Sequence, residues 1–222
     1  MMLELILASQ SPRRRQLVNL LGCSVTAVAA DVDETQITTP DPAQNTIDTA
    51  RLKADTILAQ WRRPAADARP SLPRPLLLAA DTTVALGRQM LGKPHDAETA
   101  VHTLRLLRQQ RHDVYTGMVI VDMASGHRIE DVTSVSVTMR NYSDVEIAAY
   151  VATGDPLDKA GAYAIQHPVF RPVARLHGCY LGVMGLSICH LRQVLQRLDI
   201  PVSVDRERLR QAHAGYPCPY IA

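Results

Sequence analysis

The sequence predicts an α/β fold in a single domain that covers residues 1–222. Short apolar runs typical of buried strands alternate along the chain with segments whose apolar residues recur at helical spacing. Gly, Pro, Ser and Asp residues separate these segments as turns and helix caps. Because the chain has 222 residues and 46% of them are hydrophobic, it can bury a sizeable core, which excludes a disordered or fibrous protein.

The first unit is predicted to be a strand, a helix cap and a helix. Residues 3–8 form an apolar run suited to a buried strand. Ser11 can cap the following helix, Pro12 suits its first turn, and Gly22 can end it. The unit therefore presents a helix N-terminus directly after a strand.

The remaining elements follow from the same two periodicities. Helical spacing predicts helices over residues 46–59, 96–110, 143–152 and 188–198. Strands are predicted over residues 76–80, 114–123 and 129–139, and residues 84–94 resemble a β-hairpin. The strand 76–80 delivers Asp81 and Thr82 at its C-terminal end, where open α/β sheets usually bind ligands.

Three segments depart from these periodicities. Residues 62–75 hold four prolines and four arginines, which predicts an exposed loop insertion. Residues 213–222 include Pro217 and Pro219 and are expected to form a weakly ordered tail. Residues 154–166 are rich in Gly, Asp and Lys and follow neither helical nor strand spacing.

Composition argues against several classes of partner. A net charge of +2 and an aromatic content of 4% disfavour a nucleic-acid binder. No apolar stretch approaches the ~20 residues that span a bilayer, so we expect no membrane association and a cytoplasmic location. The four cysteines are far apart and form no CxxC pair, and His177 and His190 lack metal-ligand spacing. We therefore expect reduced thiols, with neither a disulfide framework nor a zinc ribbon.

A turn of serines and arginines is the first candidate binding motif. Ser9, Ser11, Arg13 and Arg14 lie around Pro12 at the strand-to-helix junction. Free backbone N–H groups, hydroxyls and guanidinium groups can together bind a triphosphate through charge-assisted hydrogen bonds. The alternative is ordinary capping, because serines commonly cap helices and arginines commonly solvate first turns.

Carboxylates and lysines form the second candidate set, which comprises Asp33, Glu34, Lys53, Asp81 and Lys93. Carboxylate oxygens can hold Mg²⁺ or Mn²⁺, and lysines can neutralise a leaving pyrophosphate. Taken singly, each residue is equally compatible with a solvated loop.

The segment 158–166, DKAGAYAIQ, is the third candidate. Gly161 permits an unusual backbone conformation, while Lys159 and Gln166 offer a charge and an amide for recognition. A tight surface turn before a strand is the alternative.

Taken in order, the motifs of the chain resemble those of the Maf-like nucleotide pyrophosphatases. The blocks that carry the resemblance are ILASQSPRRRQLVNLLG, VDE at 32–34, RLKA around Lys53, AADTTVALGRQMLGKP and DPLDKAGAYAIQ. The resemblance spans nearly the whole chain. It implies a mixed, twisted sheet with flanking helices in two lobes around a cleft, as in the related inosine triphosphate pyrophosphatases, and a homodimer.

The resemblance also implies roles for individual residues. Asp81 is expected to be the proton acceptor, and Glu34 and Asp81 are expected to be catalytic and to hold the divalent metal cation, Mg²⁺ or Mn²⁺. Phosphate-binding roles are implied for Ser9, Arg14, Lys53 and Lys93. Substrate choice is implied at Arg13, Thr82 and Gln166, a combination that resembles the dTTP/UTP type.

The chain departs from the family pattern near its C-terminus. GLS at 185–187 replaces the usual GLP, Gly182 replaces an Asn, and HPVFRPVARLHG replaces a more glycine-rich segment. The expected activity is metal-dependent hydrolysis of dTTP and UTP, or of modified pyrimidine nucleotides, to the monophosphate and pyrophosphate. Two alternatives remain: a non-catalytic nucleotide-sensing regulator of growth or division, and a broad or 7-methyl-GTP-type pyrophosphatase that removes damaged nucleotides.

Overall fold

The computed structural model describes residues 3–62, 75–200 and 202–221 and confirms the α/β fold class. One mixed sheet contains seven strands in the order β2-β1-β3-β5-β6-β7, with β4 paired to β3. The strands are β1 Glu4–Ala8, β2 Ser24–Val28, β3 Pro75–Leu86, β4 Gln89–Leu91, β5 Arg111–Asp122, β6 Arg128–Met139 and β7 Val173–His177. The α-helices are α1 Pro12–Val18, α2 Pro42–Arg62, α3 Ala97–Leu107, α4 Asp144–Val151, α5 Tyr180–Val183, α6 Ile188–Arg197 and α7 Arg206–Ala212.

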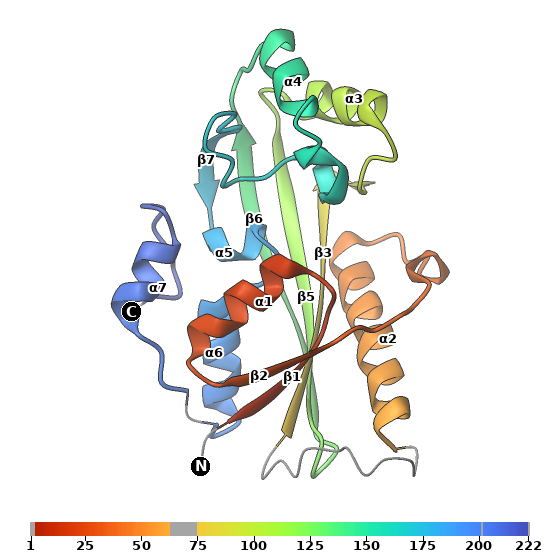
Figure 1. Ribbon diagram of the computed structural model, residues 1–222, viewed down its shortest axis with the longest axis vertical. Coiled ribbons are helices and arrows are strands. Elements are labelled where there is room, and N and C mark those ends of the chain that lie inside the picture. Colours follow the sequence, from red (N-terminus) through yellow and green to blue (C-terminus); the bar gives the residue numbers. More distant parts are fainter. Residues whose placement is uncertain (1–2, 63–74, 201, 222) are drawn as a thin grey trace.

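Three long antiparallel strands, β3, β5 and β6, run through both lobes of the molecule (Figure 1). The short strands β1 and β2 are parallel to β3 and flank only its first half, since the β1–β3 register ends where Ala8 meets Ala79. At the other end of the sheet, β7 pairs with the last residues of β6. Beyond Ala79, β3 therefore has no parallel neighbour, and the next residues open toward the space between the lobes.

The lower lobe has helices on both faces of the sheet (Figure 1). Helix α2 covers one face, where Ala50, Ala54 and Ile57 are buried against Ile6 and Leu77. Helices α1 and α6 lie on the opposite face and join the larger core cluster. Because small alanines face the sheet, α2 can approach it closely.

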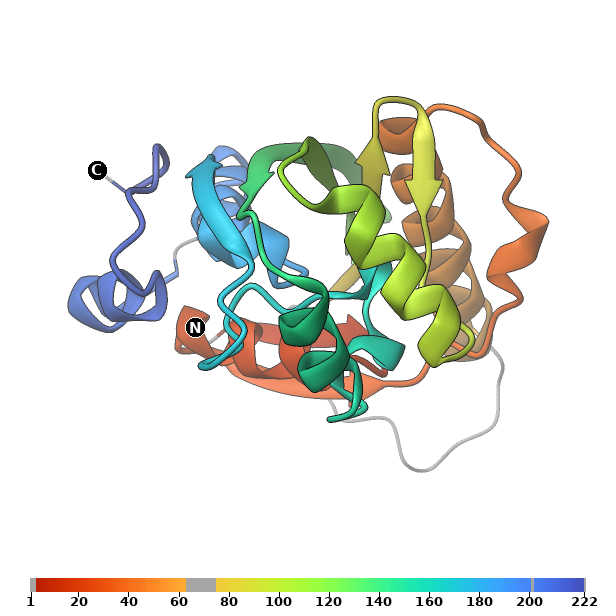
Figure 2. The ribbon, with the colours of Figure 1, turned by 90° about the horizontal axis from the view of Figure 1, so that it is seen from above.

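The upper lobe contains α3, α4 and two 3-10 turns, η3 Asp155–Asp158 and η4 Ala160–Ala162. Figure 2 shows these elements from above, over the ends of the long strands. Aromatic side chains hold the lobe together: the ring of Tyr150 stacks on that of Phe170 at 4.3 Å, and Tyr142 lies 4.9 Å from Phe170. Phe170 lies in the segment that departs from the family pattern, so that departure supplies packing for this lobe.

Most of the predicted elements are confirmed. Ser11 caps α1, Ser143 and Glu146 form the expected capping box of α4, and β3 and β4 form the expected hairpin. Two boundaries are clearly wrong. The strand expected to end at Ala80 continues to Leu86, so Asp81 and Thr82 lie in mid-strand, and the helix expected over residues 46–59 extends from Pro42 to Arg62. The strand continues because β5 pairs with β3 from Leu76 to Ala85, long after β1 has ended.

Several elements were not predicted, namely β2, β7, α5 and α7. Of the loop insertion expected over residues 62–75, Arg62 instead ends α2 and Pro75 begins β3; residues 63–74 lie outside the described residues. The expected tail, described up to residue 221, makes contacts that the sequence did not predict: His213 is buried, and Tyr216 stacks on Tyr180 with ring centroids 5.1 Å apart. No helix in the described part of the chain has both the length and the apolar character needed to cross a membrane.

Candidate active site

A cleft of about 860 Å³ lies between the two lobes, within the size range of small-molecule sites. Its walls come from the β1–α1 turn, α2, mid-β3, the segment after β4, the η3–η4 region and the segment after α5. All nine sequence-predicted site residues line it: Ser9, Arg13, Arg14, Glu34, Lys53, Asp81, Thr82, Lys93 and Gln166. The fold thus brings together residues that are up to 157 positions apart in the chain, from Ser9 to Gln166.

An ammonium group between two carboxylates forms the centre of the cleft. Lys53 Nζ lies 2.7 Å from Asp81 Oδ1 and 2.8 Å from Glu34 Oε1. Lys53 is only 7% exposed, and the Asp81 side chain is 15% exposed, whereas 56% of the Glu34 side chain is exposed. The pair on the Asp81 side is therefore largely removed from water, and the Glu34 side remains open to solvent.

The charge state of Glu34 follows from this arrangement. Burial alone would raise the pKa of Glu34, but the nearby Lys53 outweighs it by charge and hydrogen bonding, and Lys93 and Arg14 add to the effect. The net result is a pKa below the ordinary value. Glu34 is therefore an anion at neutral pH, as a ligand for a cation must be.

The position of Lys53 depends on close packing between α2 and β5. Gly117 of β5 lies against the start of α2, where a Cβ atom would come within 2.6 Å of the Thr46 backbone carbon. Lys53 follows Thr46 by seven residues, about two helical turns, so both are on the face of α2 toward the sheet. Because Gly117 pairs with Asp81 across the β3–β5 ladder, the same contact sets the distance between Lys53 and Asp81.

Arg14 forms the second centre of positive charge. Its guanidinium donates to the Gly185 carbonyl through Nε at 2.9 Å and to Thr82 Oγ1 through Nη2 at 2.9 Å. Burial lowers the pKa of Arg14, while the carboxylates of Asp81 and Glu34 raise it in opposition. Two hydrogen bonds thus fix the guanidinium on the wall of the cleft.

The hydroxyl of Thr82 contacts other groups of the protein. Besides accepting from Arg14, its hydroxyl lies 3.0 Å from Thr116 Oγ1 and 3.2 Å from the Gly185 oxygen. Thr116 in turn donates to the Gly182 carbonyl at 3.1 Å. The hydroxyls of Thr82 and Thr116 therefore connect β3 and β5 to α5 and to the loop after it.

Ser9 and Ser11 shape the turn between β1 and α1. The buried Ser9 hydroxyl accepts a hydrogen bond from the Ser11 amide at 3.2 Å, and the Ser11 hydroxyl accepts from the Arg14 amide. Ser11 therefore caps the helix, which is the role given above as the alternative to phosphate binding. Ser9 lines the cleft beside it.

Arg13 reaches across the cleft to the opposite lobe. Its Nη1 lies 3.0 Å from Asp158 Oδ2, although Arg13 and Asp158 are 145 residues apart. Lys159, only 7% exposed, donates within its own loop to the Asp155 carbonyl, the Asp155 carboxylate and the Asp158 carboxylate. These contacts account for all three ammonium hydrogens, so Lys159 orders the loop that carries Asp158 and Gln166.

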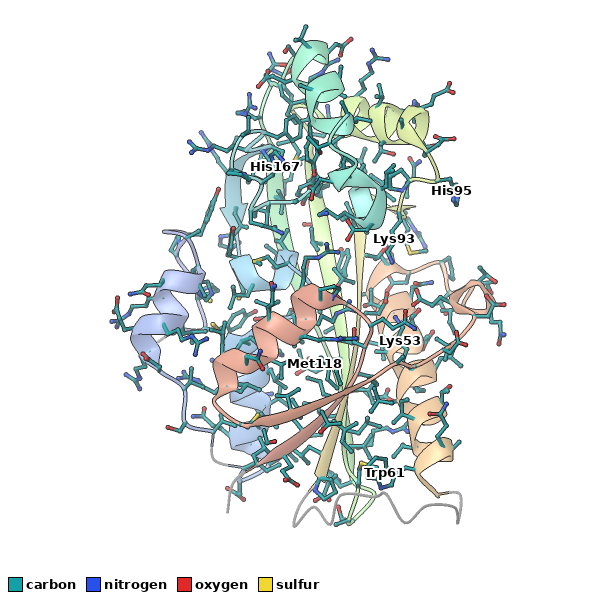
Figure 3. All side chains as sticks on the ribbon, in the orientation of Figure 1. Lys53, Trp61, Lys93, His95, Met118 and His167 are labelled. Atoms are coloured by element: carbon teal, nitrogen blue, oxygen red, sulfur yellow. The ribbon has the colours of Figure 1, made fainter. Side chains whose placement is uncertain are left out.

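The distribution of lysines distinguishes the cleft from the rest of the surface. The chain has 24 lysines and arginines but only three lysines, Lys53, Lys93 and Lys159, and all three line the cleft. Figure 3 shows Lys53 on α2 and Lys93 beyond β4, on opposite sides of the cleft. Lys93 is exposed, whereas the other two are buried.

Sequence reasoning missed some residues of the site and misassigned another. Asp158, Thr116 and Gly185 contact Arg13, Thr82 and Arg14. Asp158 and Gly185 lie in motifs named from the sequence but were given no role there, and Thr116 lies in none of these motifs. Asp33 was grouped with Glu34, yet its carboxylate accepts from the Thr35 amide and hydroxyl at 3.0 and 2.6 Å and caps a 3-10 turn. A short side chain directly before a turn was the available signal for that role.

A cleft that combines two carboxylates with several cations is typical of enzymes that act on phosphate compounds. Comparison with known proteins identifies the family: residues 4–198 match the model described as Maf-like protein, so the chain belongs to the Maf-like family. A relative from Thermomicrobium roseum, named dTTP/UTP pyrophosphatase, is 42% identical over 93% of this chain and 89% of that protein. Another from a Synechococcus species, named nucleoside triphosphate pyrophosphatase, is 36% identical over 89% of this chain and 95% of that protein.

These relatives confirm the expected enzyme class, a hydrolase of the nucleoside triphosphate pyrophosphatase type. Among solved structures, the Ham1 protein of Staphylococcus aureus aligns with a TM-score of 0.42 and 12% identity, over 62% of this chain and 72% of that one.

Proposed function

We propose that this protein uses a divalent cation, Mg²⁺ or Mn²⁺, to hydrolyse dTTP and UTP to the nucleoside monophosphate and pyrophosphate. The observation that supports the proposal most directly is the position of Lys53 between Asp81 and Glu34 inside the cleft. This arrangement of side chains combines anionic groups that can bind a cation with a positive charge that can bind phosphates. The names of the relatives supply the class of substrate.

The residues at this point fit a divalent cation. Oxygens of Glu34 and Asp81 already lie around one positively charged group, the ammonium of Lys53, at 2.7–2.8 Å. Mg²⁺ is commonly held by one or two carboxylates, with substrate phosphates and water completing the coordination. When bound here, the ion would supply polarisation of the phosphate and activation of water.

In the proposed reaction, water attacks the α phosphorus, the bond to the bridging α–β oxygen breaks, and pyrophosphate leaves. Asp81 accepts the proton of the water, and Lys53 holds Asp81 in place through the 2.7 Å ion pair. Arg14 and Lys93 neutralise charge on the phosphates, and Ser9 contributes a hydroxyl on the same wall. These groups stabilise the charge that develops on the leaving pyrophosphate.

Of the three residues to which the resemblance assigns substrate choice, Gln166 supports the pyrimidine assignment most directly. Gln166 is exposed in the cleft and can both donate to and accept from a pyrimidine edge. Thr82 acts through Arg14, and Arg13 acts together with Asp158.

Most of the residues that depart from the family pattern have structural roles away from the cleft. Ser187 caps α6, and β7 lies within the segment 167–178. Among the described residues that line the cleft, none belongs to 167–178.

The test is a panel of dTTP, UTP, CTP, ITP, 7-methyl-GTP and modified pyrimidine triphosphates with Mg²⁺ or Mn²⁺, with release of monophosphate and pyrophosphate measured. We expect dTTP and UTP to be cleaved fastest. Asp81→Asn should abolish turnover and keep nucleotide binding, and Glu34→Gln should shift the metal titration or reduce turnover. Glu98→Gln, a change in the exposed first turn of α3, is the matched control and should behave like the wild type.

Three other outcomes would contradict the proposal. Saturable nucleotide binding without turnover across the panel would indicate a sensor. Comparable cleavage of all substrates, or a preference for 7-methyl-GTP, would indicate the broad or 7-methyl-GTP type. Full activity of Asp81→Asn would remove Asp81 from the reaction. The homodimer and the cytoplasmic location stay predictions, which light scattering and cell fractionation can check.

A further inference from the structure

Three of the four cysteines of the chain meet a histidine at the outer side of the lower lobe, away from the cleft. Ligand atoms of Cys179, Cys189, His213 and Cys218 all lie within 4.8 Å of one another. Cys179 and Cys189 are fully buried, His213 is 2% exposed, and Cys218 is partly buried. All four cysteines are free thiols, as expected, but the fold brings together three that are far apart in the sequence and places them around one imidazole.

The spacing of the ligand atoms suits a tetrahedral ion. His213 Nε2 lies 3.5 Å from Cys179 Sγ and 3.5 Å from Cys189 Sγ. Around zinc, sulfur at about 2.3 Å and nitrogen at about 2.0 Å in tetrahedral geometry are about 3.5 Å from each other. The two nitrogen–sulfur separations therefore match those of a tetrahedral zinc site, and the remaining ligand atoms lie within 4.8 Å of one another. Three sulfurs and one nitrogen are also one of the ligand sets of structural zinc sites.

The histidine is held in the tautomer that binds metal. His213 Nδ1 lies 2.7 Å from the Leu209 carbonyl oxygen, which can only accept a hydrogen bond. Nδ1 therefore carries a proton, which leaves Nε2 as the nitrogen that can bind a metal, and Nε2 faces the sulfurs of Cys179 and Cys189. Such a hydrogen bond from the second ring nitrogen to a carbonyl is the usual outer support of a zinc-bound histidine.

The four ligands come from two parts of the chain. Cys179 immediately precedes α5, and Cys189 lies in the first turn of α6, whereas His213 and Cys218 follow α7. The family match ends at residue 198, so two ligands belong to a C-terminal segment beyond it. This segment lies along α5 and α6, where Tyr216 stacks on Tyr180 and the Tyr220 ring is 5.3 Å from that of His190 (Figure 1).

We propose that Cys179, Cys189, His213 and Cys218 bind one zinc ion in a structural site that anchors the C-terminal segment, residues 205–221, to α5 and α6. With four protein ligands the coordination is closed, as is typical of structural rather than catalytic zinc. The site is separate from the cleft and does not depend on the proposed function. Binding is expected to stabilise the folded state, because the ligands are brought together only when the chain is folded.

The first experiment measures the zinc content of the purified protein by mass spectrometry after incubation with zinc and removal of free metal. We expect one zinc ion per chain in the wild type. Cys218→Ser and His213→Gln should lose it and melt at a lower temperature. Cys23→Ser is the matched control, since Cys23 is the one cysteine outside the cluster, and it should retain zinc. Cys218 is partly exposed near the chain end, so its replacement should leave the fold intact.

The second experiment separates this zinc from metal held by the carboxylates of the cleft. A mercurial thiol reagent should release the zinc, and cobalt in its place should show intense visible bands and thiolate charge transfer, which Cys218→Ser abolishes. Zinc held by Glu34 and Asp81 would do neither. The proposal is overturned if the incubated wild type holds no zinc, if Cys218→Ser holds as much as the wild type, or if thiol titration of the unfolded chain reveals a disulfide among these cysteines.

Discussion

The contact between Lys53 and its two carboxylates can be tested by replacing Lys53 with methionine. Methionine keeps most of the length of the unbranched side chain and a similar helix propensity but removes the ammonium. The carboxylates of Asp81 and Glu34, each within 2.8 Å of Nζ, would then face each other without the cation between them. The change should therefore reduce both the stability of the fold and the activity.

The magnitude follows from burial. Removing one partner of a buried ion pair costs about 3–5 kcal/mol, because the other charge stays buried and unpaired. The cost for Asp81 approaches this range, because its side chain is only 15% exposed. The Glu34 side chain is 56% exposed, so solvent screens its charge and reduces its contribution to the cost. We expect the free energy of unfolding to fall by about 2–4 kcal/mol. The pKa of Glu34 should rise, because Lys53 is the strongest group that lowers it.

The assay is urea unfolding at pH 7 together with the rate of pyrophosphate release. Lys93→Met is the matched control: Lys93 lines the same cleft but is exposed, so its loss should change stability by less than about 0.5 kcal/mol and raise KM. The reasoning would be refuted if Lys53→Met unfolded at the same urea concentration as Lys93→Met and retained wild-type turnover.

Three further changes test other parts of the structure. Burial lowers the pKa of His112 to about 4, so between pH 6.5 and about 4 only the unfolded chain gains the proton. Between pH 7 and 4.5, the free energy of unfolding, measured with urea, should therefore fall by about 2–3 kcal/mol more in the wild type than in His112→Gln. Gly117→Ala should displace α2, lowering the melting temperature and kcat together, since its Cβ would meet the Thr46 backbone at 2.6 Å. Thr82→Val should lower kcat/KM for dTTP and UTP equally, because the hydroxyl holds Arg14; a changed substrate ratio would contradict this.

Local chemistry made much of the fold predictable from the sequence. The helix cap at Ser11 and the capping box at Ser143 depend on residues three positions apart, and the hairpin of β3 and β4 depends on a short turn. Signals of this kind need no knowledge of distant contacts. The motifs of the resemblance also gave the members of the site, all of which line the cleft.

The errors arise where distant parts of the chain decide the outcome. The length of β3 is set by β5, about 35 residues later, and the exposed edge strand β2 has too little alternation to be recognised. Similarly, the contact of Arg13 with Asp158 joins the two lobes. The cysteine–histidine cluster was missed for the same reason: its first two members are ten residues apart and the third follows 24 residues later, a spacing that resembles no local metal motif.

The choice between lysine and arginine follows the chemistry of each location. Arginine is far commoner in this chain, and where it lines the cleft its planar group is held by fixed partners, as Arg14 is by Gly185 and Thr82. The ammonium of Lys53 instead occupies the small space between two carboxylates, which the wider guanidinium would force apart. A compact ammonium on a flexible stem can also rotate its three donors toward different partners. Lys53 therefore lies where the positive charge must be small, and Arg14 lies where the wall of the cleft must be rigid.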